Sequence, residues 1–419
     1  MEKFCKIAVG FLLLFSHFSV FSENIEGEVK DLKRRVRELE KKVQQHSETD
    51  SNVDIQSRLT EIVNILEGVN IEGGVTFIAQ GAHKANSDTL SDSGESITDA
   101  SYSFDLILEK DFFEDSKVLL HFEAGNGDGV TDELKLFSSV NADATGDESF
   151  DLIEVWFEHR FKSVPLTLTM GKIDVTCCID TNEYANDETA QFLGNIFKNS
   201  PVVEFPDSNS VGIRVGFSAG EILNVNLVGV DADSNWDDVF DSMFIALQFG
   251  FKQIFFRRQG NYRFYMWLND KNHTKWNNTS ATKERGYGFG LSFDQELSEV
   301  LGVFLRYGWQ NPKVYMNGEE FSLEQSYSVG LQLDGVLWNR DNDTFGFGFG
   351  QVFPSSDYKN ANCLKAKSET HLEAYYNFRM NDNFALSFDF QAVWNAYGRD
   401  TNRSGKPIVL GGLRIQVDL

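Results

Sequence analysis

The residues best placed to do chemistry gather in residues 173–208, the longest connector that we expect in the chain. This connector is rich in carboxylates, but no Ser/His/Asp set stands out by local motif, and no His or Cys spacing fits a metal centre. We therefore expect a protein that is not an enzyme and has no cofactor or metal. The carboxylates would act by charge, as in ion selection. The candidates are Asp174, Asp180, Glu183, Asp187, Glu188 and Glu204.

Sixteen segments that alternate between apolar and polar residues must position this connector, and they extend from residue 71 to Leu419. Alternation with a period of two predicts β-strands with one face toward an apolar phase and the other toward water. The apolar phase is a protein core in a soluble sandwich and lipid in a transmembrane barrel. We expect strands at 71–80, 100–110, 116–125, 151–161, 164–172, 209–219, 222–231, 239–250, 260–269, 284–294, 299–309, 322–335, 343–353, 369–380, 383–395 and 408–419.

The connectors between these strands alternate in length, and this favours the barrel. Long loops on one side and short turns on the other are typical of bacterial outer-membrane barrels, and an even strand number returns the C-terminus to the periplasm. The sequence therefore predicts a 16-stranded antiparallel outer-membrane β-barrel over 71–419. The long far-side loops include 81–99, 126–150, 173–208, 270–283, 310–321, 354–368 and 396–407. The near-side turns are 111–115, 162–163, 220–221, 295–298 and 381–382, with two longer ones at 251–259 and 336–342.

The strand faces predict which side chains line the water-filled interior. In strand 151–161, Ile153, Val155 and Phe157 are expected to share the lipid face. In strand 209–219, Arg214 alternates with apolar residues, and a charge near the middle of the lipid face would cost about 2–4 kcal/mol. Arg214 is therefore expected to face the lumen. The other expected lumen-facing residues are Glu154, Trp156, Glu158, Arg160, Arg306 and Asp389.

The first 22 residues predict a signal peptide. Lys3 and Lys6 precede an apolar stretch that is too short to span a membrane as a helix, and a cleavage site is expected near Ser22. Such a leader would direct the chain to the outer membrane of a Gram-negative type of bacterium, where the barrel would contact lipids.

Residues 23–70 predict a helix that is distinct from the barrel. Val29, Leu32 and Val36 begin a short apolar repeat with the four-three spacing of a coiled coil. We expect residues 25–69 to form a homo-oligomer or to tether the chain in the periplasm. An amphipathic helix that lies on the barrel is the alternative.

Charge and cysteine content exclude further classes of function. The formal net charge of −25 argues against binding to nucleic acid. After removal of the leader three cysteines remain, which is too sparse and odd a count for a disulfide framework. A bridge from Cys363 to Cys177 or Cys178 is one hypothesis, and free thiols are the other.

The segment from Gly171 to Arg214 carries a resemblance to a known family. It reads Gly-Lys-Ile-Asp at 171–174, Asn-Glu-Tyr-Ala-Asn-Asp-Glu at 182–188 and Glu-Phe-Pro at 204–206. This pattern resembles the carbohydrate-selective porin (OprB) family, including iron-uptake porins with an N-terminal coiled coil. Two departures are Cys177-Cys178 within the loop and Leu419 in place of the usual terminal Phe.

The resemblance implies a barrel through which small solutes diffuse, narrowed by loops that fold inward. A 36-residue connector is also too long to be only a link between strands. Tyr184, Phe192, Leu193 and Phe197 would pack the 173–208 loop against the wall. Its six carboxylates would then lie at the constriction opposite Arg214, with Arg160 or Arg306 nearby.

Three functions follow from these observations. The first is a porin for passive diffusion of small hydrophilic solutes, carbohydrates or ions. The second is a siderophore or iron-uptake porin, because chains of that kind also carry a coiled coil before the barrel. The third is a structural protein in which the helix tethers the envelope and the barrel is an anchor.

Overall fold

A computed structural model describes the part of the chain that forms the sheet. The described residues are Arg34, 68–85, 95–206, 208–239, 241–255, 257–398 and 407–419. The chain divides into two units, Met1–Gly68 and Val69–Leu419, and Arg34 and Gly68 are the only described residues of the first. The expected signal peptide, the helix of residues 23–70 and the oligomer contact of residues 25–69 therefore lie almost wholly outside the described residues. In the described part, no helix has the length and apolar character needed to cross a membrane.

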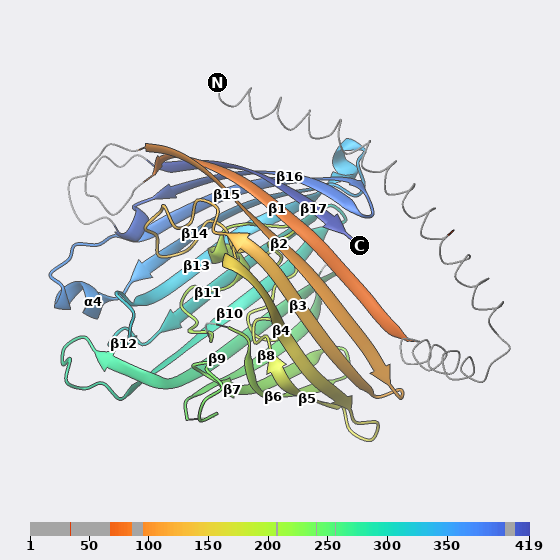
Figure 1. Cartoon of the computed structure of the whole chain (residues 1–419), viewed down its shortest axis with the longest axis horizontal. Coiled ribbons are helices and arrows are strands. Elements are labelled where there is room, and N and C mark those ends of the chain that lie inside the picture. Colours follow the sequence, from red (N-terminus) through yellow and green to blue (C-terminus); the bar gives the residue numbers. More distant parts are fainter. Residues whose placement is uncertain are drawn as a thin grey trace. The chain divides into compact units, whose positions relative to one another are not determined.

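The second unit is a closed antiparallel barrel, as the alternating pattern predicted. The first strand, β1 (Val69–Ala85), pairs with both β2 (Glu95–Phe112) and the last strand, β17 (Ile408–Asp418), so the sixteen-strand ring has no open edge (Figure 1). The other wall strands are β3 (Ser116–Gly127), β4 (Gly146–Arg160), β5 (Leu166–Ile173), β6 (Ser210–Ala219), β7 (Leu223–Asp231), β8 (Met243–Phe255), β9 (Arg258–Lys275), β10 (Glu284–Ser298), β11 (Leu301–Gln310), β13 (Leu323–Asp334), β14 (Thr344–Pro354), β15 (Glu369–Asn381) and β16 (Phe384–Trp394).

Among the described residues, one further strand and four short helices do not belong to the strands of this ring. The strand β12 (Val314–Met316) pairs with the far-side end of β9. The helices are α3 (Asn195–Lys198), η1 (Gly335–Trp338), α4 (Ser356–Ala361) and η2 (Ala396–Gly398). Only α3 lies in the connector that the sequence marked as a candidate site.

The structure corrects one local prediction about the strands and adds a bulge to another strand. The pairing of β8 with β9 continues to Phe255 opposite Arg258, so the connector at 251–259 is a tight near-side turn rather than a longer one. In β4, a bulge shifts the register so that Leu152 is opposite Phe122 while Glu154 remains opposite His121. The extra residue is Ile153, so Leu152 continues the apolar face that Val155 and Phe157 begin.

The outer face of the barrel is apolar and its inner face is polar. In β6, Ile213 and Phe217 are exposed on the outside, whereas Arg214 points inward and binds Asn226 of β7. Many large apolar side chains are exposed in the same way around the ring, which is the pattern expected of a surface that contacts lipid. The apolar core lies inside the barrel, where connectors pack against the inner face.

Candidate functional site

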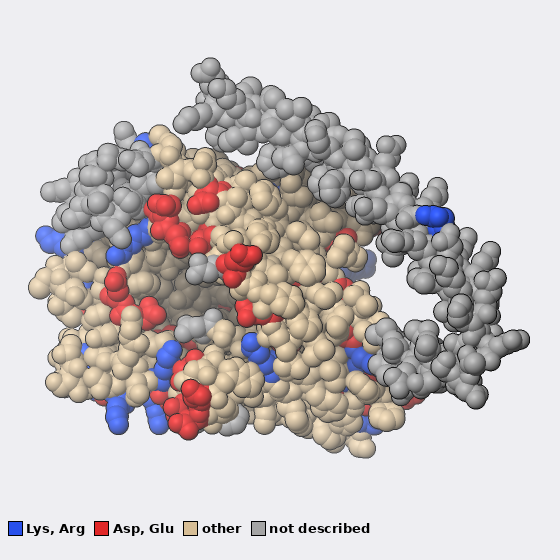
Figure 2. Space-filling model, in the orientation of Figure 1, with Lys and Arg blue, Asp and Glu red and all other residues tan. Residues whose placement is uncertain are grey.

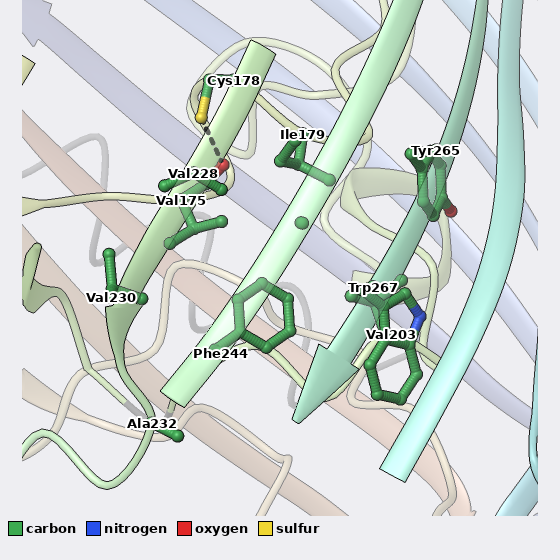
Figure 3. Packing of buried hydrophobic residues seen from close by; sticks show 11 residues of the cluster. Val175, Cys178, Ile179, Val203, Val228, Val230, Ala232, Phe244, Tyr265 and Trp267 are labelled. Carbon is green, nitrogen blue, oxygen red and sulfur yellow. Dashed lines mark hydrogen bonds between the residues drawn. The ribbon is translucent and has the colours of Figure 1, made fainter. Parts of the chain in front are cut away.

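The candidate site is built by the connector between β5 and β6, residues 174–209, which folds into the barrel and is called here the first inward loop. Its first part places Val175, Cys178 and Ile179 in a buried cluster with inward side chains of β7, β8 and β9. Phe244 and Trp267 of that wall stack with ring centroids 6.1 Å apart (Figure 3). The loop is thus held inside the lumen by apolar contacts as well as by its chain ends.

The second part of the loop fills a socket lined by glycine on β14. The rings of Phe192 and Phe197 lie 4.8 Å apart, and Phe192 also packs edge-on against Phe304 of β11 and Tyr375 of β15. A methyl group added at Gly348 would lie 2.6 Å from the Phe197 ring, which is closer than carbon atoms approach. A glycine here is therefore what lets the aromatic side chains reach the wall, and both rings pack as the sequence predicted.

Arg306 of β11 clamps the loop backbone and does not line the pore. Its guanidinium donates to the Asp180 carboxylate at 3.0 Å and to the carbonyl oxygens of Asp180, Ala185 and Phe197. Arg306 is 1% exposed and Asp180 is 0% exposed. The expectation that these two residues lie at the constriction is therefore wrong, because the loop itself covers them.

One acidic and one basic residue of the wall hold the rest of the loop by its backbone. The Glu373 carboxylate of β15 accepts hydrogen bonds from the backbone N–H groups of Leu193 and Gly194, at 2.6 and 2.9 Å. Arg414 of β17 donates to the carbonyl oxygens of Glu188 and Gln191. These contacts fix the segment that carries α3 at a defined depth in the barrel.

Two more predicted residues have structural contacts. Glu204 lies 2.9 Å from the imidazole Nε2 of the buried His273 on β9, at the far-side end of the loop. Asp389 of β16 is buried and accepts a hydrogen bond from Gln391. Asp389 faces inward as predicted, but it is covered and cannot contact a solute.

A second connector, residues 128–145 between β3 and β4, also folds into the barrel and is called the second inward loop. Its Val130, Leu134 and Val140 are buried against β1, β16 and β17 side chains. The Glu369 carboxylate of β15 accepts from the N–H groups of Phe137 and Ser138. The sequence pattern predicted only a far-side loop at 126–150, although the apolar residues of this loop indicate that it packs inside.

The two inward loops join each other and leave one part of the wall uncovered. Ala142 N–H donates to Leu193 O at 2.8 Å, and Asn195 N–H donates to Ser139 O at 3.0 Å. Many inward polar side chains of β7–β11, β13–β17 and β1 are buried, as Ser328 is at 1% exposure, whereas others toward the near-side turns, such as Gln332 and Asp334, are partly exposed. Most charged inward side chains of β2–β6, called here the open wall, remain partly exposed, as Asp105 does at 31%. The lumen is therefore open beside β2–β6.

Charged pairs run along the open wall. His121 Nε2 of β3 lies 2.8 Å from Asp105 of β2, and its Nδ1 lies 3.4 Å from Glu154 of β4. Nearer the short-turn side, Lys117 lies 2.7 Å from Glu109. Asp105, Glu109, Lys117 and Glu123 were not predicted as site residues, although their alternation with Leu106, Leu108, Leu120 and Phe122 indicates the inward face.

The predicted residues of β4 and β6 belong to this open wall. Arg214 lies 3.5 Å from Glu158, and Arg160 lies 3.2 Å from the same carboxylate. Trp156 donates its indole N–H to Glu154 at 3.1 Å. Arg214 therefore pairs with a carboxylate of its own wall rather than standing alone opposite the acidic loop.

The pore side of the first inward loop carries one ion pair. Lys198 Nζ lies 2.5 Å from the Glu188 carboxylate, and both side chains are partly exposed. Burial alone would lower the pKa of Lys198, but Glu188, Asp174 and Asp143 more than offset it, so its pKa is raised and it stays cationic. Burial and the nearby Glu188 raise the pKa of Asp143, on the second inward loop, to about 8.

The remaining loop carboxylates differ in accessibility. Glu183 and Asp187 are exposed, and Asp187 accepts from the Thr189 N–H and hydroxyl groups. Asp174 accepts from the Thr176 N–H and from the Cys177 thiol. Figure 2 shows acidic side chains gathered around a hollow in the barrel. Of the six predicted loop carboxylates, the structure thus leaves Asp174, Glu183, Asp187 and Glu188 accessible and uses Asp180 and Glu204 as anchors.

The three described cysteines are free thiols, so the hypothesis of a bridge from Cys363 is wrong for this structure. Cys178 is buried in the cluster behind the loop and donates to Val175 O, whereas Cys177 is exposed beside Asp174. Cys363 lies in a different place, just after α4 on a far-side loop.

Three carboxylates on the far-side loop between β7 and β8 are also close together. Asp231, Asp233 and Asp241 each bring one oxygen within 4.8 Å of the others. Asp231 is buried at the end of β7 while Asp233 and Asp241 are more exposed, and such acidic groups are common in proteins without a bound ion.

Comparisons with known proteins agree with the barrel architecture. A family model described as "Carbohydrate-selective porin, OprB family" matches residues 113–419. An uncharacterized protein of Aquifex aeolicus (strain VF5) is 28% identical over 227 residues, which are 53% of this chain and 58% of that protein. The chain thus spans just over half the length of this relative.

Solved outer-membrane channels share the fold. Pseudomonas putida OprB in its high-pH structure has a TM-score of 0.73 at 15% identity, over 87% of this chain and 97% of that one. Its low-pH structure has a TM-score of 0.53 at 13% identity, with the same coverage. The channel DcaP of Acinetobacter baumannii has a TM-score of 0.53 at 12% identity, over 84% of this chain and 97% of that one.

Proposed function

Because the chain belongs to the carbohydrate-selective porin, OprB family, we propose that it is a passive channel for small hydrophilic solutes across the outer membrane. A closed barrel satisfies every strand's backbone hydrogen bonds within the wall, which is what allows a sheet to cross lipid. Its exposed outer face carries large apolar side chains such as Ile213, Phe289 and Phe388. The barrel therefore has outer-membrane lipids as its surroundings.

The observation that carries this proposal is the open wall. On β3 alone, Glu123, His121 and Lys117 face inward in sequence from the far side to the near side. Ionisable side chains are rarely left unpaired away from water, because burying a charge costs several kcal/mol or more. Partly exposed charges along the whole strand support a continuous aqueous route beside β2–β6.

The charges along this route favour cations over anions. Among the described residues where the inward loops meet the open wall, the carboxylates of Asp105, Glu123, Glu154, Asp174 and Glu188 outnumber the basic groups of His121, Lys198 and Arg214. Fixed negative charge in a narrow passage raises the local concentration of cations.

The same wall also suits uncharged sugars. Its acidic and basic side chains alternate as donors and acceptors at 2.7–3.5 Å from one another, and hydroxyl groups can replace either partner. Trp156 adds a partly exposed aromatic surface between Glu154 and Glu158. These features support a pore that passes neutral polar solutes as well as small cations.

Purified protein in planar bilayers and in liposomes tests this function. We expect discrete single-channel steps in KCl and a cation-selective reversal potential. We also expect liposome swelling in sugar solutions at rates that fall as the sugar becomes larger. Protein-free vesicles are the control for leakage. The absence of both conductance and swelling from correctly inserted protein would contradict the proposal.

A further inference from the structure

Lys198 is the only basic residue of the first inward loop, where the sequence places seven acidic residues. The second inward loop also has a single base, Lys135, but its ammonium group lies 3.4 Å from Glu320 and over the ring of Tyr397. The two inward loops thus present one cation each, and only Lys198 is close to the carboxylates at the narrowing.

The backbone that carries Lys198 is held firmly in place. Lys198 is the last residue of α3, which follows the Leu193 and Gly194 N–H groups bound by Glu373. The preceding residue, Phe197, packs in the β14 socket and gives its carbonyl oxygen to Arg306. The side chain itself is 24% exposed, so the fixed backbone places a partly exposed ammonium group beside Glu188.

Carboxyl groups from three elements surround this ammonium group. Glu188 of the same loop forms the ion pair with it at 2.5 Å. Asp174 at the start of the loop and Asp143 of the second inward loop interact with it electrostatically. Glu123 of the open wall interacts with both Lys198 and Glu188, so the lysine faces acidic groups on the pore wall as well as on the loops.

We propose that Lys198 is a specificity-determining residue that limits the cation selectivity of the pore. Its ammonium group occupies the place to which these carboxylates would otherwise draw a permeant cation. It neutralises part of the fixed negative charge and repels cations at short range. This inference rests on the proposed channel function. It adds that the charge of Lys198 sets how strongly the pore prefers cations over anions.

The test compares reversal potentials across bilayers under a KCl gradient at pH 7 for wild type, Lys198→Met and Lys198→Arg. We expect Lys198→Met to raise the ratio of K⁺ to Cl⁻ permeability about twofold or more near 0.1 M salt. The increase should shrink toward 1 M, where the Debye length falls from about 10 Å to about 3 Å. Lys198→Arg keeps the charge and should match wild type.

Two further variants separate a local effect from a general loss of positive charge. Lys198→Met combined with Glu188→Gln removes one charge of each sign and should return the ratio toward the wild-type value. Lys135→Met removes a positive charge from the second inward loop, away from the narrowing, and should leave the ratio unchanged. Lys198→Gln replaces Lys198→Met if the latter does not insert as a folded barrel.

Two results would overturn the inference, and neither is the failure of the channel itself. One is conductance with an unchanged permeability ratio in the neutral Lys198 variant. The other is an equal increase in Lys135→Met. A wild-type protein that inserts but does not conduct would instead contradict the proposed function.

Discussion

Replacing Arg306 by methionine should loosen the first inward loop without opening the barrel. Its guanidinium directs its hydrogen bonds to the loop, where it donates to one carboxylate and three backbone carbonyl oxygens. Breaking a buried ion pair by removing one partner costs about 3–5 kcal/mol, because the other charge is left buried. The docked position of the loop should lose stability of this size.

The effect on the channel follows from what remains. The Glu373 and Arg414 contacts still hold the later part of the loop, so the loop should shift at Asp180 and Ala185 rather than leave the lumen. We expect a higher single-channel conductance and larger current noise in Arg306→Met, measured in planar bilayers at 1 M KCl. At this salt concentration surface charge is screened, so a change in conductance reflects the width of the pore.

A second variant tests whether the ion pair is the cause. Asp180→Asn in the Arg306→Met background removes the stranded charge and keeps an acceptor for the Ser200 N–H, which Asp180 binds at 2.7 Å. This double variant should recover part of the wild-type conductance and noise. Wild-type conductance and noise in Arg306→Met would refute the clamp, as would a double variant no closer to wild type than the single one.

Three other predictions address the socket, the ion pair and the second inward loop. Gly348→Val places a side chain against Phe197 and should destabilise the docked loop by about 1–3 kcal/mol, with altered conductance, whereas Gly411→Ala, where the added group meets nothing within 4 Å, should behave as wild type. Glu188→Gln leaves Lys198 without its partner and should lower the K⁺ to Cl⁻ permeability ratio; an unchanged ratio would place Glu188 outside the permeation route. Asp143 has a pKa of about 8 and is mainly neutral at pH 7, so raising the pH from 7 to 9 adds a negative charge near the narrowing. The permeability ratio should rise over this interval in wild type and rise less in Asp143→Asn, and equal pH responses would count against this assignment.

Much of the architecture follows from local patterns in the sequence. A period of two, with long and short connectors in turn, predicted the sixteen-strand barrel because each strand must face both lipid and water. The same alternation predicted that Arg214, Glu154 and Glu158 face inward, and the structure places Arg214 within 3.5 Å of Glu158. The bulge at Ile153 was not predictable in this way, because a single extra residue leaves the apolar pattern of β4 almost unchanged.

The roles of inward side chains needed the structure. The alternation of apolar and polar residues predicts that Arg306 and Asp389 face the lumen. It does not predict that loops from distant parts of the chain cover them. Asp180 looked like its neighbours Glu183 and Asp187 in the sequence, yet it is the one that meets the buried guanidinium. Such assignments depend on long-range packing of the inward loops, which no local pattern encodes.

The central claim is that the pore runs beside the open wall, β2–β6. The most direct test is the accessibility of single cysteines to a charged thiol reagent. In a protein with Cys177 and Cys363 changed to serine and Cys178 to alanine, one cysteine replaces Asp105 on the open wall or Ser328 on the covered wall. A cationic methanethiosulfonate added during bilayer recording should reduce the conductance of Asp105→Cys and leave Ser328→Cys unchanged. Equal block of both variants, or block of Ser328→Cys alone, would contradict a pore confined to the side of β2–β6.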